Sequence, residues 1–236
     1  MYSLNIKAGS SVQLPLTPIQ KLIGKRMLES KAKKPCFYLE AKADVTELVS
    51  MRPGLRKSLG VKITTNAFYI RALALAAKEF PLMTGKLSQS AETIEITESI
   101  NVGFAVSAPQ GLVVPVIKEA DSKSLAEIAK EEKYLTECAR SNKLTLEQIE
   151  AENIALSNLG VYGIDSFLGI VPPPASTILA VGNAIRTLVP KDSGVVWRKM
   201  LSLTLAVDHR IINGDYASKF LKFIVSLLEE PERLVS

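Results

Sequence analysis

A single histidine, His209, lies in this chain of 236 residues, and its neighbours could support acid–base chemistry. It sits in the stretch AVDHRIINGD between Asp208 and Arg210, and Asn213 follows four residues later. The pKa of an imidazole is ordinarily about 6.5, so a rigidly held imidazole is a natural general base near neutrality. Asp208 and Arg210 flank the histidine and can pair with each other to fix the loop. The same features also fit a purely structural histidine, so both interpretations stay open at this point.

The chain offers no obvious nucleophile of its own for such a base. Its two cysteines, Cys36 and Cys138, lack an activating context, and the sequence contains no G-x-S-x-G elbow. If His209 is a base, the group that it deprotonates is therefore expected to come from the substrate, with a thiol the easiest candidate.

Composition excludes several classes of function. Hydrophobic residues make up 47% and charged residues 22% of the chain, as in an ordinary globular protein. No segment has the roughly 20 apolar residues that cross a membrane, and the first residues lack the basic-then-apolar pattern expected of a secretory signal. One histidine and two cysteines without metal-ligand spacing argue against a metal site and for a reducing compartment: the cytoplasm, the mitochondrial matrix or a plastid.

The net charge of +5 is mild. It is not gathered into the basic stripe with interleaved aromatics that is typical of nucleic-acid binders, so no nucleic-acid partner is expected. A small molecule that carries several phosphates fits the positive excess equally well.

The residues that could do chemistry must be positioned by an alternation of helices and strands. A helix should begin at Thr17, which can cap it, with Gln20 closing a capping box. Apolar residues then recur at the spacing that marks one helix face: Ile19, Leu22, Ile23 and Met27.

The remaining pattern predicts an α/β sandwich of a mixed sheet with helices. Strands are expected at 36–45, 93–97, 100–108, 111–120, 153–160, 176–185 and 195–207, and helices at 64–80, from Ser124 onward, and at 213–229. We predict one continuous domain over residues 14–236, preceded by a linker at residues 1–13 that is rich in Ser and Gly.

Several motifs in order resemble one family. The segment DHRIING resembles the D-H-R-x-x-D/N-G signature of the dihydrolipoamide acyltransferases, which form the cores of 2-oxo-acid dehydrogenase complexes. IQKLIGKRMLES resembles the opening helix of that family, and INVGFAVSAPQGLVVPVIKEAD its central hairpin. The stretch from LTLEQIEAENIALSNLG to STILAVG resembles its S-N-L-G segment and the strand that follows. The resemblance covers nearly the whole chain.

The resemblance implies a chloramphenicol-acetyltransferase-like fold and transfer of an acyl group between dihydrolipoamide and coenzyme A in a ternary complex. His209 matches the base that takes the thiol proton, and Ser157 matches the hydroxyl that donates to the tetrahedral oxyanion. Asn213 stands where many members have Asp, so we expect it to brace the loop rather than to relay charge. Arg52 matches an arginine that contacts a coenzyme A phosphate, although the adjacent Pro53 is unusual in that helix.

Substrates and partners follow from the same resemblance. Coenzyme A or acetyl-CoA and lipoamide are expected as substrates, with the lipoyl group carried on a domain outside this chain and with no metal. Self-association into trimers and a core of about 24 or about 60 subunits is expected, with His209 of one subunit meeting Ser157 of the next. The decarboxylase and dihydrolipoamide dehydrogenase components would bind through further domains, and no membrane is involved.

Some positions depart from the family pattern, and two alternatives stay open. Cys36 stands where relatives often have His, and EAEN replaces a Gly-Gly before the S-N-L-G strand, which leaves the shape of that turn undecided. GVYGIDSFLGIVPPP resembles the pyruvate-type members, which favours an acetyl group. The alternatives are an O-acetyltransferase on the same fold, whose H-H-x-x-x-D-G pattern differs from Asp-His-Arg, and a non-catalytic scaffold subunit.

Overall fold

The computed structural model of the protein describes residues 11, 13–192 and 194–235, so most of the predicted linker at 1–13 lies outside the described residues. The helices are α1 (Pro18–Lys33), α2 (Thr46–Leu59), α3 (Thr65–Glu79), α4 (Leu125–Arg140) and α5 (Gly214–Glu229). The strands are β1 (Cys36–Asp44), β2 (Lys86–Leu87), β3 (Ile94–Glu95), β4 (Val102–Phe104), β5 (Val106–Ala108), β6 (Gly111–Val113), β7 (Val116–Ile117), β8 (Ile154–Asn158), β9 (Thr177–Lys191) and β10 (Gly194–Asp208).

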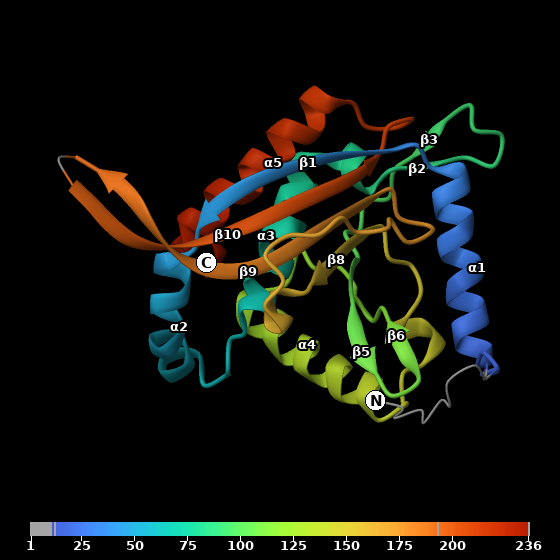
Figure 1. Ribbon diagram of the computed structural model, residues 1–236, viewed down its shortest axis with the longest axis horizontal. Coiled ribbons are helices and arrows are strands. Elements are labelled where there is room, and N and C mark those ends of the chain that lie inside the picture. Colours follow the sequence, from blue (N-terminus) through green and yellow to red (C-terminus); the bar gives the residue numbers. More distant parts are fainter. Residues whose placement is uncertain (1–10, 12, 193, 236) are drawn as a thin grey trace.

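A six-stranded mixed sheet in the order β1-β10-β9-β8-β4-β7 organises the molecule. β8 pairs in parallel with both β4 and β9, and the other neighbours in this sheet are antiparallel. Helices α3, α4 and α5 cover one face of the sheet (Figure 1), and the main hydrophobic core lies between them and the strands. The predicted α/β sandwich of a mixed sheet with helices is confirmed.

Three helices begin where the sequence predicts. Thr17 and Gln20 form the capping box of α1, Ser124 and Glu127 form that of α4, and Asn213 caps α5. In each case a side-chain oxygen accepts a backbone N–H that has no partner within the helix.

The apolar face of α1 is only partly buried, with Ile23 and Met27 half-buried. Leu22 is 58% exposed, whereas Ser30 is buried and Arg26 is half-buried. The helix lies at one edge of the molecule (Figure 1), and its Arg26 and Ser30 side chains donate to carbonyls of residues 171–173. Hydrogen bonds to a neighbouring loop, described below, therefore hold α1 in addition to its partly buried apolar residues.

The central strands are shorter than their apolar runs predict. The run at 100–108 divides into β4 and β5, and the run at 111–120 divides into β6 and β7. β4 and β7 pair within the main sheet, whereas β5 and β6 form a separate two-stranded ribbon. Pro115 lies between β6 and β7, and because proline has no N–H to donate, the ladder is interrupted there.

The strands β9 and β10 are longer than predicted and continue as a two-stranded arm beyond the sheet (Figure 1). On one face of the arm Leu188 pairs with Trp197 and Pro190 with Val195. Trp197 is 52% exposed, with the Arg186 guanidinium 4.4 Å from its ring centre. The arm therefore presents an apolar surface that the described part of this chain does not cover.

Two glycines allow the backbone after β8 to pack against β9. A Cβ added at Gly160 would lie 2.2 Å from the carbonyl oxygen of Gly182, and one at Gly182 would lie 1.9 Å from that of Asp165. These approaches fix the turn that follows Ser157, because backbone atoms cannot move aside as a flexible side chain can.

Gly160→Ala should therefore destabilise the fold by about 3 kcal/mol or more, through a clash that only backbone movement relieves. Gly24→Ala, in α1 with no atom within 4 Å of the added Cβ, is the control and should be neutral or stabilising by up to about 1 kcal/mol. Urea unfolding of both variants measures the difference. Equal stabilities would show that the close approach does not constrain this turn.

Candidate active site

His209 lies immediately after β10, at the junction of strand and loop that the sequence predicts. Its backbone N–H donates to the carbonyl of Pro35 at 3.1 Å, and its exposed ring meets Phe37 edge-on at 5.3 Å between ring centres. The imidazole is thus held by its backbone and one aromatic neighbour, and the residue is exposed to solvent.

The predicted pairing of Asp208 with Arg210 is confirmed. The Asp208 carboxylate is 2% exposed and accepts hydrogen bonds from Arg210 Nε at 2.9 Å and Nη2 at 2.6 Å. The Asp208 carbonyl also accepts the N–H groups of Ile211 and Ile212, each at 3.0 Å. This bidentate ion pair, together with the turn after Asp208, fixes the backbone on both sides of His209.

Asn213 braces the loop as a helix cap. Its side-chain oxygen accepts the N–H of Tyr216 at 2.9 Å, and its backbone carbonyl accepts that of Ala217 at 3.0 Å. The structure thus gives Asn213 a bond at the start of α5, on the far side of the turn from His209.

Ser157 lies on β8 between two hollows and lines both of them. A polar hollow of about 300 Å³ contains Asn66, Glu132 and Arg140 among its lining residues. An apolar hollow of about 290 Å³ is lined mainly by aliphatic and aromatic side chains, including Phe167 and Ile170. A hydroxyl at this position can meet two different reactants, one from each hollow.

One chain does not bring Ser157 and His209 together. Ser157 pairs with Ala180, Ala180 pairs with Thr204, and His209 lies five residues beyond Thr204, just after the end of β10. A rise of about 3.3 Å per residue and a strand spacing of about 4.8 Å put the two side chains roughly 20 Å apart. Direct cooperation within one chain is therefore excluded by the sheet register.

Glu132 is a buried carboxyl in the polar hollow that sequence reasoning missed. Its two oxygens accept hydrogen bonds from the Thr64 hydroxyl at 2.6 Å and from Asn66 Nδ2 at 3.2 Å. Burial raises the pKa of Glu132, and the two hydrogen bonds oppose that effect. Thr64 also caps α3, so the carboxyl ties that helix end to the hollow.

Cys36 faces Asp208 across β1 and β10 and is not activated. Burial raises the pKa of the Cys36 thiol, and the charge of Asp208 adds to the increase. The group therefore remains a thiol at neutral pH, which is unsuited to nucleophilic attack. No role was assigned to Cys36 from the sequence, and this environment gives it none.

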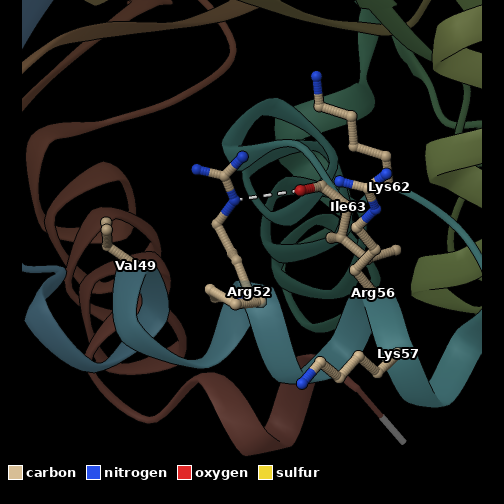
Figure 2. A pocket seen from close by; sticks show the side chains of 7 residues that line it. Val49, Arg52, Arg56, Lys57, Lys62 and Ile63 are labelled. Atoms are coloured by element: carbon tan, nitrogen blue, oxygen red, sulfur yellow. Dashed lines mark hydrogen bonds between the residues drawn. The ribbon is translucent and has the colours of Figure 1, made fainter.

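Arg52 opens onto a basic hollow between α2 and the segment before α3. The hollow has a volume of about 620 Å³, and its basic lining residues are Arg52, Arg56, Lys57 and Lys62. Arg52 Nε donates to the Ile63 carbonyl at 3.1 Å, and Figure 2 shows the two terminal nitrogens on the other side of the guanidinium. None of the described residues that line the hollow is acidic, so the hollow suits a phosphate-bearing ligand.

Only Arg52 of this basic hollow was predicted from the sequence. Arg56 follows it by four residues, the spacing that places two side chains on one helix face, so this neighbour was detectable. Lys62 belongs to the loop after α2, and its approach depends on tertiary structure. Pro53 lies inside α2 and leaves Arg52 in place.

The turn before β8, in the segment EAEN, contains a residue with left-handed backbone conformation that is not glycine. Ala151 has a φ of 74°, and Glu152 next to it is buried.

Among the described residues no group of three or more His, Cys, Asp or Glu side chains could hold a metal ion. No helix in the same part of the chain is long and apolar enough to cross a membrane.

Comparison with known proteins identifies the relatives of this chain. A family model described as 2-oxoacid dehydrogenases acyltransferase (catalytic domain) matches residues 8–236. The acetyltransferase component of the pyruvate dehydrogenase complex of Rickettsia bellii is 35% identical over 92% of this chain and 52% of its own length. The mitochondrial pyruvate dehydrogenase protein X component of Mus musculus is 32% identical over 96% of this chain and 46% of its own length. The chain thus spans about half the length of these relatives.

Solved structures of the same family are also similar to this chain. The chain is similar, with a TM-score of 0.92 and 32% identity over 97% of this chain and 96% of the other, to Azotobacter vinelandii dihydrolipoamide acetyltransferase. It is equally similar, with the same TM-score, identity and coverage, to the cubic core of a pyruvate dehydrogenase multienzyme complex. A chloramphenicol acetyltransferase matches with a TM-score of 0.56 at 15% identity, over 86% of this chain and 94% of the other. That last likeness establishes the fold alone.

The buried carboxyl of Glu132 yields a pH prediction. Because its pKa is raised in the folded protein, its contribution to stability is complete below the unfolded value of about 4.3 and is lost as the pH rises through the folded value. Glutamine has no such ionisation. The difference in unfolding free energy, Glu132→Gln minus parent, should therefore increase as the pH rises from about 4 to about 7.

Urea unfolding of parent and variant at several pH values measures this difference. Glu137→Gln, at an exposed position on the same helix, is the matched control. A difference between Glu132→Gln and the parent that does not change with pH would contradict the assignment.

Proposed function

The chain belongs to the 2-oxoacid dehydrogenase acyltransferases, as a catalytic domain, and we propose that it transfers an acetyl group between dihydrolipoamide and coenzyme A. The acetyl group is proposed from the acetyltransferase names of its relatives. In this proposal the domain comprises residues 14–236 and works within a longer protein that carries the lipoyl group.

One observation carries the proposal. The Azotobacter vinelandii structure was determined to define the role of one serine, one histidine and one asparagine in the catalytic mechanism of that enzyme. There the serine lies 52 residues before the histidine and the asparagine four residues after it. Ser157, His209 and Asn213 have the same separations in this chain.

His209 acts in this mechanism as the general base. Its imidazole takes the proton from the coenzyme A thiol, and the resulting thiolate attacks the carbonyl carbon of the acetyl thioester on dihydrolipoamide. The carbon–sulfur bond to the lipoyl group then breaks, and the departing thiolate regains the proton from the imidazolium. No acetyl group is attached to the protein, which agrees with the unactivated thiol of Cys36.

Ser157 stabilises the intermediate of this transfer. Its hydroxyl donates a hydrogen bond to the oxyanion that forms when the thiolate attacks, an interaction absent from the planar thioester. The two hollows that meet at Ser157 allow the two sulfur atoms to approach the same carbonyl from different sides.

Coenzyme A is proposed to reach Ser157 through the basic and polar hollows. The basic hollow ends at Lys62 and Ile63, and the polar hollow begins at the next residue, Thr64. The phosphates would lie against Arg52, and the amide-bearing arm would extend along the hydroxyl and amide groups of the polar hollow. The apolar hollow is left for the aliphatic chain of dihydrolipoamide.

A second copy of the chain is proposed to complete the site. The sheet keeps Ser157 and His209 roughly 20 Å apart in one chain, so each must meet its counterpart across an interface. Exposed apolar residues adjoin the hollows of Ser157, among them Val161 at 76% and Leu168 at 62%. Trimers that build a larger core fit the similarity to a cubic core. The decarboxylase and dihydrolipoamide dehydrogenase components are proposed to bind through domains outside this chain.

A scaffold subunit without transferase activity is the second candidate. It is favoured by the similarity to the mouse protein X component, whose name specifies no reaction. Ser157 and His209 are both present here, which favours the enzyme. Assembly of purified protein without measurable transfer would favour the scaffold.

Removing either reacting group should abolish most turnover. His209→Ala should lower kcat by about 10²–10⁴-fold, and Ser157→Ala by about 10²–10³-fold, because one loses the base and the other the oxyanion donor. The assay is acetyl transfer from acetyl-CoA to dihydrolipoamide, with Ser58→Ala on the exposed side of α2 as control. Parent-like turnover by His209→Ala would refute the proposed function.

Arg52→Met should raise KM for coenzyme A about tenfold with little change in kcat, because a charge-assisted bond to phosphate is lost. If Arg52 contacts the 3′-phosphate, dephospho-coenzyme A should bind parent and variant alike. Lys86→Met, which removes a lysine paired with Glu95 outside the hollow, is the control. An unchanged KM in Arg52→Met would remove Arg52 from the binding site.

A further inference from the structure

Three polar side chains of α1 form a stripe that faces a proline-rich segment. Arg26, Ser30 and Lys34 follow one another at intervals of four residues, at the end of α1 and its C-cap, so they lie on one face. We call them the donor stripe. Each donates to a backbone carbonyl of residues 171–175: Arg26 to Pro173, Ser30 to Val171 at 2.5 Å, and Lys34 to Ala175.

The segment needs donors from outside. Residues 172–174 are all proline and supply no N–H to a ladder, whereas their carbonyls still require hydrogen bonds. Ser30 and Val171 are both buried, so water does not replace this bond freely. The donor stripe therefore determines where the segment lies.

The donor stripe is itself anchored beside the strand of Ser157. Arg26 Nη2 forms an ion pair at 3.3 Å with Glu152, whose side chain is 3% exposed and lies two residues before β8. Burial raises the pKa of Glu152, and the Arg26 charge opposes that effect. Met27, next to Arg26, lines the apolar hollow together with Ile170 and Pro172.

The other end of the donor stripe reaches the turn of His209. The carbonyl of Pro35, next to Lys34, accepts the N–H of His209 at 3.1 Å. The carbonyl of Ser176, next to Ala175, accepts the N–H of Asp208 at 2.9 Å. The bond between Lys34 and Ala175 thus joins the two backbone segments that hold this turn.

We propose that the donor stripe positions both halves of the active site. Ser30 and Arg26 hold the wall of the apolar hollow beside Ser157, and Lys34 holds the turn that presents His209. None of the three touches a reacting atom, so they are positioning residues. The inference rests on the proposed function for its kinetic readout, and it goes beyond that function in giving each residue a separate effect.

Two substitutions separate these effects. Ser30→Ala leaves the Val171 carbonyl without its donor, and KM for dihydrolipoamide should rise about fivefold while KM for coenzyme A is unchanged. Lys34→Met keeps the aliphatic stem and removes the donor. Its kcat should fall about tenfold with both KM values unchanged, because a small displacement of a catalytic group is costly.

Conservative variants and a neighbour provide the controls. Lys34→Arg and Ser30→Thr retain a donor and should recover most of the lost kcat or KM, which also covers the case in which Lys34→Met or Ser30→Ala does not fold. Lys33→Met removes an exposed lysine that pairs with Glu29 at 2.8 Å, and it should match the parent.

Amide hydrogen exchange of the assembled protein tests the inference independently of activity. The N–H groups of Asp208 and His209 should exchange at least about tenfold faster in Lys34→Met, and at parent rates in Ser30→Ala and Lys33→Met. Unchanged exchange in Lys34→Met, or KM and kcat values that merely follow Tm in both variants, would overturn the proposal. Loss of the proposed function alone would leave the predicted exchange pattern intact.

Discussion

The register of β8, β9 and β10 is the constraint on which the site depends. Ser157 is paired through Ala180 to Thr204, and the four last residues of β10 separate Thr204 from His209. No side-chain rotation spans the roughly 20 Å that this register imposes. Each chain therefore presents two half-sites at separate places on the same rigid sheet. Association of copies becomes a requirement of the proposed chemistry, and the exposed apolar arm of β9 and β10 is consistent with it.

The charged residues around His209 and around Ser157 are arranged differently. On the His209 side, the buried Asp208 carboxylate is neutralised by Arg210, and the nearby thiol of Cys36 stays protonated. On the Ser157 side, Arg140 lines the polar hollow itself, and four further basic residues line the hollow at Arg52, where a phosphate-bearing substrate would be held. Part of the positive excess of the chain is thus gathered around one hollow, which the net charge alone does not reveal.

Much of the fold followed from local signals in the sequence. The capping boxes at Thr17 and Ser124, the cap at Asn213 and the pairing of Asp208 with Arg210 are short-range features that residue types specify directly. The hydrogen bonds from α1 to the proline-rich segment were missed, because that segment lies more than a hundred residues away and needs donors rather than apolar contact. Glu132 and Lys62 were missed for the same reason: only the tertiary fold places them beside the hollows. Ser157 was found through resemblance, since a serine at the end of a strand carries no signal of its own.

Complementation between inactive variants tests the central claim, that the site is shared between copies, most directly. His209→Ala and Ser157→Ala chains with different affinity tags would be co-expressed in equal amounts, and particles that carry both tags would be assayed for acetyl transfer. If Ser157 of one chain meets His209 of the next, random mixing should restore about a quarter of the parent turnover per site, because one arrangement in four joins an intact serine to an intact histidine. Mixed particles with no more activity than either variant alone would contradict the account.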